Sequence, residues 1–325
     1  MEPRRAEARR FHVRPRIHVR WVGAVTRLGI TSVSNARLKT IRRLRRRAAA
    51  GVFLVEGYRG LLHAVETRAA VRELYVAPPL YLGDAEPRLV ERAEAAGAEV
   101  FELGVEAFRS IAGRVRPDGL LALVERIDLG LDDLRLPPRP LLLVAEAIER
   151  PGNLGTIVRT ACGAGVDAVL VCDGPTGVFH PDAVQGSVGA LFRVPVVQAR
   201  GEPAIDWLGA RGIPILVASP DAESRYWEVD CAGPLALVVG SERHGVSGSF
   251  RAAAAAEVRI PMGAGVDSLN VAVATGIVLF EAARQRAASA GCAASARRTA
   301  ARSSGGRNGL RTSSAPSSDP SVSGA

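Results

Sequence analysis

Three segments in the second half of the chain carry polar residues that could hold a ligand. The first, residues 149–159, places Asn153, Gly155 and Arg159 between an apolar strand and a helix. Asn153 could cap the helix, and Gly155 would permit the close approach of another backbone. Arg159 offers a permanently charged fork suited to a phosphate or a carboxylate. The alternative interpretation is a surface arginine on a capped helix.

The second segment, residues 235–245, is an apolar strand followed by an acidic loop. Glu242 lies in this loop between Gly240 and Gly245. A loop at the carboxyl end of a parallel strand is a usual position for a ligand. Many junctions between a strand and a loop share this pattern, so the segment does not define a ligand by itself.

The third segment, residues 258–272, is a strand that enters a Gly-rich loop and then a helix. Ser268 could cap this helix, and exposed N–H groups at its start could bind polar ligand atoms. Pro261 and Met262 could form an apolar wall for an adenine or a methylthio group. Together the segments indicate a nucleotide-like ligand. The glycines of a dinucleotide-binding or phosphate-binding loop are absent, which disfavours a nicotinamide-dependent oxidoreductase.

An α/β framework must position these segments, because short apolar strands alternate with helical patterns along the chain. In the second half, the strands are continuous apolar runs such as Leu141–Ala145, which favours a parallel sheet covered on both faces. A Pro-rich stretch separates this part from a smaller α/β part. We predict five segments: a flexible basic extension over 1–34, a small α/β domain over 35–127, a linker over 128–139, an α/β ligand-binding domain over 140–288 and a disordered tail over 289–325.

The net charge of +9 is concentrated at the ends of the chain. Residues 1–47 hold 15 basic and 2 acidic residues, whereas residues 48–288 hold 22 basic and 30 acidic residues. A basic arm on a mildly acidic body suits a polyanion such as nucleic acid. Within it, Leu38, Ile41 and Leu44 form an apolar stripe on a basic helix over residues 35–50, and we expect RNA contacts from Arg37, Lys39, Arg42, Arg43 and Arg46.

Other classes of protein are disfavoured by what the sequence lacks. It has no apolar run of the ~20 residues that cross a bilayer, and no apolar region follows the basic N-terminus as in a secretory signal. The four cysteines and five histidines form no pattern typical of a metal site. We therefore expect a cytoplasmic protein with neither a membrane anchor nor a metal.

The three segments, taken together and in this order, resemble the SpoU (TrmH) branch of the SPOUT RNA methyltransferases. The resemblance rests on Pro-Gly-Asn153-Leu-Gly155 followed by Arg159, on Gly240-Ser-Glu242-x-x-Gly245, and on Ile260-Pro-Met262 followed by Ser268-Leu-Asn-Val-Ala272. A fourth patch, residues 180–195, is also similar, although Gly186 stands where the family commonly has alanine. Residues 35–125 are similar to the family's L30e-like RNA-binding domain.

The resemblance implies a trefoil-knotted α/β domain with a parallel sheet, which binds S-adenosylmethionine and methylates a ribose 2′-hydroxyl of structured RNA as a homodimer. It implies a cofactor pocket lined by Gly240, Ser241, Gly245, Ile260, Met262, Ser268 and Leu269. It also implies that Arg159 sits at the target ribose and phosphate, often across the dimer, with Asn153, Glu242 and Asn270 as the other catalytic-site residues.

The expected substrate is 23S ribosomal RNA, because the domain pairing resembles thiostrepton-resistance-type 23S enzymes and the N-terminal helix is basic. Two alternatives stay open at this point. The chain could methylate transfer RNA instead, or it could be a non-catalytic RNA-binding protein that keeps the fold.

Overall fold

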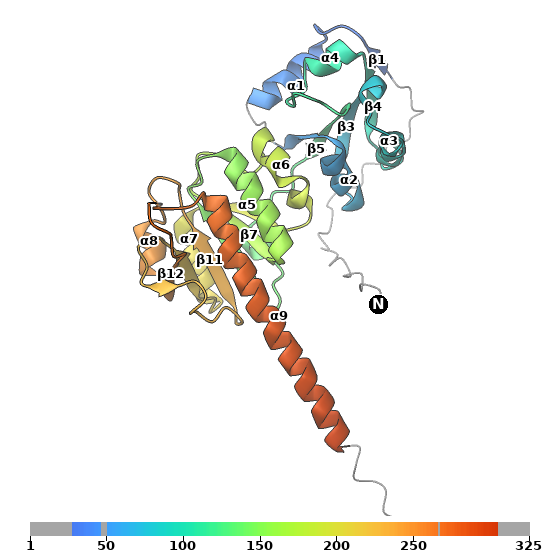
Figure 1. Cartoon of the computed structure of the whole chain (residues 1–325). Helices are drawn as coiled ribbons and strands as arrows, with labels where there is room; N and C mark the ends of the chain where they lie inside the picture. Colours follow the sequence, from blue (N-terminus) through green and yellow to red (C-terminus); the bar gives the residue numbers. More distant parts are fainter. Residues whose placement is uncertain (1–27, 47–50, 266, 305–325) are drawn as a thin grey trace, which may run out of the picture.

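The computed structural model describes residues 28–46, 51–265 and 267–304. Most of them build two sheets, each with helices on both faces, joined by a short connection (Figure 1). The predicted basic extension lies outside the described residues up to position 27, and so does the predicted tail from position 305.

The N-terminal sheet is mixed and has the strand order β1-β4-β3-β5-β2. β5 is antiparallel to β2 and β3, whereas β1, β4 and β3 are parallel. The strands are β1 (Leu28–Ile30), β2 (Val52–Glu56), β3 (Val71–Val76), β4 (Glu99–Leu103) and β5 (Leu120–Glu125), and the helices are α1 (Ala36–Arg46), α2 (Tyr58–Glu66), η1 (Pro78–Leu80), α3 (Ala85–Ala95) and α4 (Val105–Arg109).

The apolar stripe predicted for the basic helix packs α1 against this sheet. Leu38, Ile41 and Leu44 are buried in one cluster with Phe108 of α4. The helices α2 and α3 cover the opposite face of the sheet. Burial of the stripe leaves Lys39, Arg43 and Arg46 exposed on the outer side of α1, as the spacing predicts, whereas Arg42 is half-buried.

The second sheet has seven parallel strands in the order β10-β12-β9-β11-β6-β7-β8. Its strands are β6 (Leu141–Glu146), β7 (Ala168–Cys172), β8 (Val196–Ala199), β9 (Ile215–Ala218), β10 (Ser224–Arg225), β11 (Leu235–Val239) and β12 (Ala256–Arg259), and its helices are α5 (Pro151–Ala164), α6 (Pro181–Ser187), η3 (Ala190–Phe192), α7 (Gly201–Ala210), α8 (Gly248–Ala252) and α9 (Val271–Ser304). The predicted α/β class with a parallel sheet is confirmed.

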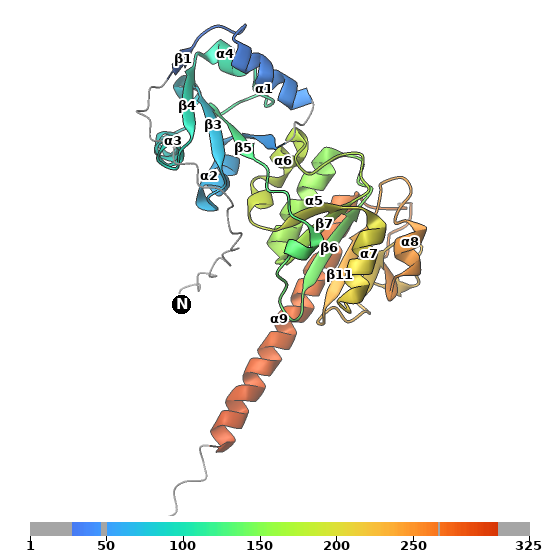
Figure 2. The same ribbon diagram turned by 180° about the vertical axis from the view of Figure 1, so that it is seen from behind.

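Both faces of this sheet are buried, which explains its continuous apolar strands. In β6, Leu141 and Leu143 face a cluster that includes α5 and α9, whereas Leu142 and Val144 face α7 and α8. Each such side chain stabilises the fold by about 1.5–3 kcal/mol when fully buried. The two helical layers lie on opposite sides of the strands (Figure 2).

The predicted linker is packed against the second sheet. Leu129 forms a parallel bridge with Val197 beside β8, and a turn of 3-10 helix, η2 (Leu131–Asp133), follows. Leu134 is buried in the cluster formed with α7. These apolar side chains fix the connection to the domain that follows it.

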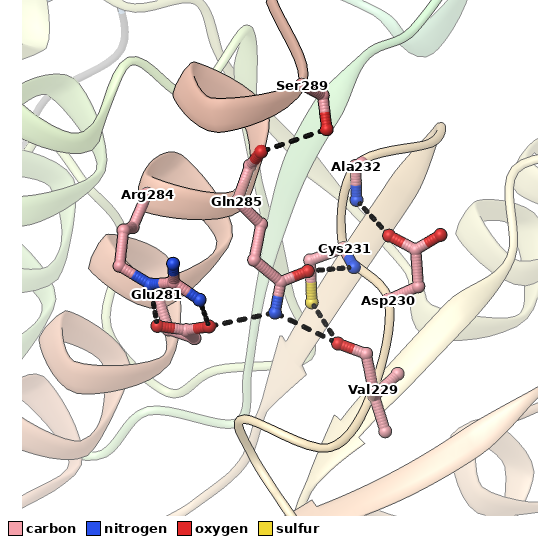
Figure 3. Close-up of polar contacts among 8 residues, drawn as sticks. All are labelled: Val229, Asp230, Cys231, Ala232, Glu281, Arg284, Gln285 and Ser289. Carbon is pink, nitrogen blue, oxygen red and sulfur yellow. Dashed lines mark hydrogen bonds and ion pairs between the residues drawn. The ribbon is translucent and has the colours of Figure 1, made fainter. Parts of the chain in front are cut away.

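The last helix, α9, is fastened to the loop that precedes β11. The Gln285 side-chain oxygen accepts the N–H of Cys231 (2.8 Å), and its nitrogen donates to the carbonyl of Val229 (3.1 Å) (Figure 3). At the next residue, the Arg286 guanidinium donates to the carbonyls of Arg139 (2.9 Å), Cys231 (3.0 Å) and Pro140 (3.1 Å), and also to that of Gly233.

Beyond this point α9 continues away from the sheet to Ser304 (Figure 1). We predicted a disordered tail from residue 289, which is wrong for residues 289–304, because α9 includes them. Alanine is the most frequent residue of this stretch and has the highest helix propensity, which favours continuation of the helix. Among the helices in the described part of the chain, none is both long and apolar enough to cross a membrane.

The two sheets meet through an aromatic contact and a polar clamp. The ring of Phe53 lies 4.9 Å from that of Phe179, measured between centroids. At the edge of this contact, the Arg193 Nε donates to His63 Nδ1 (2.8 Å) and an Arg193 Nη donates to Glu66. Gly189 packs directly on the imidazole, since a Cβ there would lie 2.4 Å from a ring carbon of His63.

This clamp should weaken in acid. Burial and the charge of Arg193 lower the pKa of His63, although Glu66 acts in the opposite direction. Because the pKa is lower in the folded chain, the stabilisation is complete above the ordinary value of 6.5 and is lost as the pH falls through the folded pKa. We expect the protection factors of amides in α2 and α6, which correct exchange for the intrinsic effect of pH, to fall on acidification from about pH 7.5 to pH 5.5. His63→Gln, which keeps an acceptor but cannot be protonated, should flatten this response; an equal response in both proteins would contradict the assignment.

Candidate functional site

The loops that follow β9, β11 and β12 begin side by side, because these three strands are neighbours in the sheet. Gly240 follows β11 and Ile260 follows β12, and β9 lies between these two strands. The carboxyl ends of parallel strands meet at one edge of a sheet. The end of β9 at Ala218 therefore lies between the two predicted loops. The sequence analysis missed this position, because finding it requires the strand order.

The loop after β11 is a tight hairpin. Ser241 and Gly245 exchange two backbone hydrogen bonds, each 3.0 Å long, and Gly245 has a positive φ of 68°. The Ser241 hydroxyl accepts the N–H groups of Arg243 (3.2 Å) and His244 (3.1 Å). A Cβ on Gly240 would lie 2.1 Å from the carbonyl oxygen of Gly245, so only glycine fits at that position.

Asn153 links this hairpin to the loop that precedes α9. Its amide nitrogen donates to Glu242 (2.6 Å), and its amide oxygen accepts from Asn270 (3.1 Å). The second carboxylate oxygen of Glu242 accepts the backbone N–H of Glu149 (3.1 Å). Three residues that were predicted to share a site are thus in direct contact.

The predicted helix caps were wrong. α5 begins at Pro151, so Asn153 lies inside the first turn and its side chain is free to reach the other loops. Proline favours the first helical position because its φ is already helical and it lacks an N–H. At the other helix, Asn270 accepts the N–H of Ala272 (2.9 Å) and caps α9, whereas Ser268 is exposed in the loop before it.

The hydrogen bonds around Glu242 keep it ionised. Its partial burial raises the pKa, but the hydrogen bonds from Asn153 and from backbone N–H groups outweigh that effect and leave the pKa below its ordinary value. A carboxylate with a lowered pKa is a poor proton acceptor near neutral pH. The arrangement favours support of the loops by Glu242 rather than general base catalysis.

The remaining predicted cofactor residues differ in their exposure. Ile260, Met262 and Leu269 are half-buried, and Ser268 is exposed. A Cβ on Gly263 or on Gly265 would meet nothing within 4 Å, so the loop is open at these two positions. Half-buried apolar groups next to exposed backbone fit a ligand with an adenine and a methylthio group.

Arg159 is not brought to the contact between Asn153 and Glu242. It is exposed on α5, on the outer stripe that contains Thr156 and Gly163. Six residues separate it from Asn153, which turns its side chain by about 120° around the helix. Among the described residues, Arg159 has no hydrogen bond or ion pair.

The predicted RNA-binding residues of α1 fall into two groups. Arg37 pairs with Glu73 (3.0 Å), and Arg42 donates to the carbonyl of Val33 (2.7 Å). Both therefore hold the domain together. Lys39, Arg43 and Arg46 are exposed. In the part of the chain that the structure describes, no three His, Cys, Asp or Glu side chains gather to hold a metal.

Comparison with known proteins shows the family to which the chain belongs. The model of the SpoU rRNA Methylase family matches residues 140–280, and that of the MRM3-like substrate binding domain matches residues 35–122. A 23S rRNA (guanosine-2'-O-)-methyltransferase RlmB from Ralstonia nicotianae is 35% identical over 202 residues, which cover 61% of this chain and 81% of that protein. The chain belongs to the SpoU rRNA methylase family.

Other relatives match most of this chain, including both of its domains. A 23S rRNA (uridine(2479)-2'-O)-methyltransferase from Streptomyces viridochromogenes is 33% identical over 264 residues, covering 74% of this chain and 85% of that protein. The SpoU methyltransferase AviRb from Streptomyces viridochromogenes, solved in complex with AdoMet, superposes with a TM-score of 0.71 at 28% identity. That match covers 78% of this chain and 98% of AviRb.

Proposed function

We propose that this SpoU family chain transfers the methyl group of S-adenosylmethionine to a ribose 2′-hydroxyl of 23S ribosomal RNA. The enzyme class and the cofactor predicted from the sequence are confirmed by the family and by relatives solved with AdoMet. The relatives named above are 23S rRNA 2'-O-methyltransferases, which supports ribosomal over transfer RNA. The observation that carries the proposal is the junction of three loops through Asn153.

The cofactor, when bound, supplies the methyl group, and this chain's residues hold and orient it. Gly240, Ser241 and Gly245 would hold it from the hairpin, and Ile260, Met262, Ser268 and Leu269 from the loop after β12. The close-packed Gly240 and the open Gly263 fit this role. A trefoil knot in this domain stays a prediction.

The ribose hydroxyl has to be positioned and has to lose its proton during transfer. We assign to Arg159 the anchoring of the target phosphate and the stabilisation of developing negative charge, because arginine stays protonated. The hydrogen bonds from Asn153 to Glu242 and from Asn270 to Asn153 would hold the three loops in fixed positions relative to one another. The exposed Lys39, Arg43 and Arg46 of the N-terminal domain would bind the backbone of the RNA. The substrate would be ribosomal RNA in the cytoplasm.

We also propose a homodimer in which Arg159 reaches the partner's cofactor loops. The outer stripe of α5 carries Arg159, and α9 beside it exposes Val273 (52%) and Phe280 (54%). Side chains of this size are rarely left exposed together unless a surface is covered. An isologous contact of two such faces would bury both.

Phe280→Glu should weaken the dimer. A charge in the middle of a buried apolar contact costs several kcal/mol, so we expect monomers at micromolar concentration. Sedimentation velocity measures this directly. Val115→Glu is the matched control, because Val115 is 99% exposed on the other domain and should leave the dimer intact. A Phe280→Glu protein that sediments like wild type would place the interface elsewhere.

The proposed function is tested with radiolabelled S-adenosylmethionine and unmodified 23S rRNA, followed by nuclease digestion and nucleoside analysis. A labelled 2′-O-methylnucleoside is the expected product. A parallel reaction with transfer RNA separates the two substrate classes, and label confined to transfer RNA would overturn the ribosomal assignment. Failure to bind the cofactor by calorimetry would indicate a non-catalytic RNA-binding protein.

A further inference from the structure

The hairpin after β11 presents two basic side chains at its tip. Between the bridged residues Ser241 and Gly245 lie Glu242, Arg243 and His244, all exposed. Glu242 points back to Asn153. Arg243 and His244 therefore form the outward side of a loop whose inner side belongs to the proposed site.

The tip is held in one conformation before any ligand arrives. The Ser241 hydroxyl accepts the N–H groups of Arg243 and His244, and it donates to Glu149 (3.3 Å). The backbone bridge between Ser241 and Gly245 closes the base of the loop. A rigid loop loses little conformational entropy when it binds a ligand.

Glu149 also holds the Arg243 guanidinium by one edge. Its carboxylate oxygen lies 3.4 Å from Nε of Arg243, while the Arg243 side chain is 77% exposed. Within the described residues, the two Nη groups of Arg243 have no hydrogen bond. The Nη pair of an arginine matches two oxygens of a phosphate, so this geometry leaves the phosphate-binding edge available.

We propose that Arg243, oriented by Glu149, binds a backbone phosphate of the RNA next to the target ribose. Arg243 would position the RNA and take no part in the transfer itself. It can do so because its neighbour Glu242 contacts Asn153 at the junction of the loops, which places the phosphate beside that junction. A phosphate held beside this junction would fix the register of the nucleotide that enters. The inference rests on the proposed function, because it takes RNA as the substrate.

The test compares Arg243→Ala with Arg243→Lys, Glu149→Gln and Arg225→Ala. Arg225 is the matched control, because it is an exposed arginine with one carboxylate partner, Glu228, at 3.7 Å in the same domain. Affinity for 23S rRNA transcript is measured by filter binding at several salt concentrations, and methyl transfer and cofactor affinity are measured separately.

We expect Arg243→Ala to weaken RNA affinity roughly ten-fold, raise KM more than it lowers kcat, and leave cofactor affinity unchanged. The slope of the logarithm of RNA affinity against the logarithm of salt concentration should decrease by about one counterion in Arg243→Ala. Arg243→Lys should recover part of the affinity. Glu149→Gln should show a smaller loss, and Arg225→Ala none.

RNA affinity and salt dependence that match wild type in Arg243→Ala would overturn the proposal. So would a fall in cofactor affinity equal to the fall in RNA affinity, which would make Arg243 a support of the loop. Failure of the proposed function is distinguishable, because the wild-type protein would then not methylate the transcript, whatever the effect of Arg243→Ala on RNA affinity.

Discussion

Arg159→Ala is expected to lower the rate of methyl transfer by about a hundredfold or more, while cofactor affinity stays close to that of wild type. Loss of one group that stabilises developing charge typically costs ~10²–10³ in rate. The fold should be unaffected, because Arg159 is exposed and has no partner among the described residues. Its separation from Asn153 around α5 explains why the cofactor loops should not respond.

Single-turnover methylation of 23S rRNA and calorimetry of S-adenosylmethionine binding measure the two effects. Arg200→Ala is a suitable control, because Arg200 is an exposed arginine at the end of β8, on the other side of the sheet from the cofactor loops. A parallel collapse of cofactor affinity in Arg159→Ala would place this side chain in the pocket and contradict the assignment.

Gly240→Ala should abolish cofactor binding at ordinary concentrations. The added Cβ would lie 2.1 Å from the Gly245 oxygen and 2.4 Å from the Val246 nitrogen. These are backbone atoms, so the hairpin itself must move and its contact with Asn153 must break. Overpacking of this kind costs about 1–3 kcal/mol, and the loss falls on the loop that holds the ligand.

Gly209→Ala is the matched control for this substitution. A Cβ on Gly209 would meet nothing within 4 Å, and an alanine within α7 should raise stability by up to about 1 kcal/mol. Calorimetry and thermal unfolding of both variants separate lost binding from lost folding. Unchanged cofactor affinity in Gly240→Ala would show that the hairpin is not part of the pocket.

The two inactive variants also test the dimer. In mixed dimers, an Arg159→Ala subunit with intact cofactor loops can receive Arg159 from a Gly240→Ala subunit. If Arg159 acts across a symmetric interface, the mixture should recover about a quarter of wild-type activity. If the mixture stays inactive, Arg159 acts within its own chain.

The buried strands could be predicted from the sequence to within a residue or two. Leu141–Ala145 and Leu235–Val239 were identified because strands buried on both faces are continuous apolar runs. The close approach predicted at Gly155 is confirmed. A Cβ there would lie 2.2 Å from the Ala183 oxygen, and Gly186 faces Gly155 across the same crossing.

Other features could not be predicted from the hydrophobic periodicity of the sequence. The role of Asn153 depends on Asn270, which is 117 residues away, and on a strand order that periodicity does not encode. Its position within the first turn of α5 follows from Pro151, whose fixed φ favours the first helical position. Helix α6 was missed because seven residues give too little periodicity, and α9 was taken as too short because its last turns have no apolar stripe.

The junction at Asn153 has a consequence for synthesis on the ribosome. Asn153 leaves the ribosome long before Asn270, which is 117 residues further along the chain, and at ~5–20 residues per second the delay is roughly 6 to 23 seconds. Throughout that interval the nascent chain lacks its cofactor site, whatever else has folded. Cofactor then adds to the stability of the completed domain only, so its concentration in the cell would protect finished molecules and leave truncated ones to proteases.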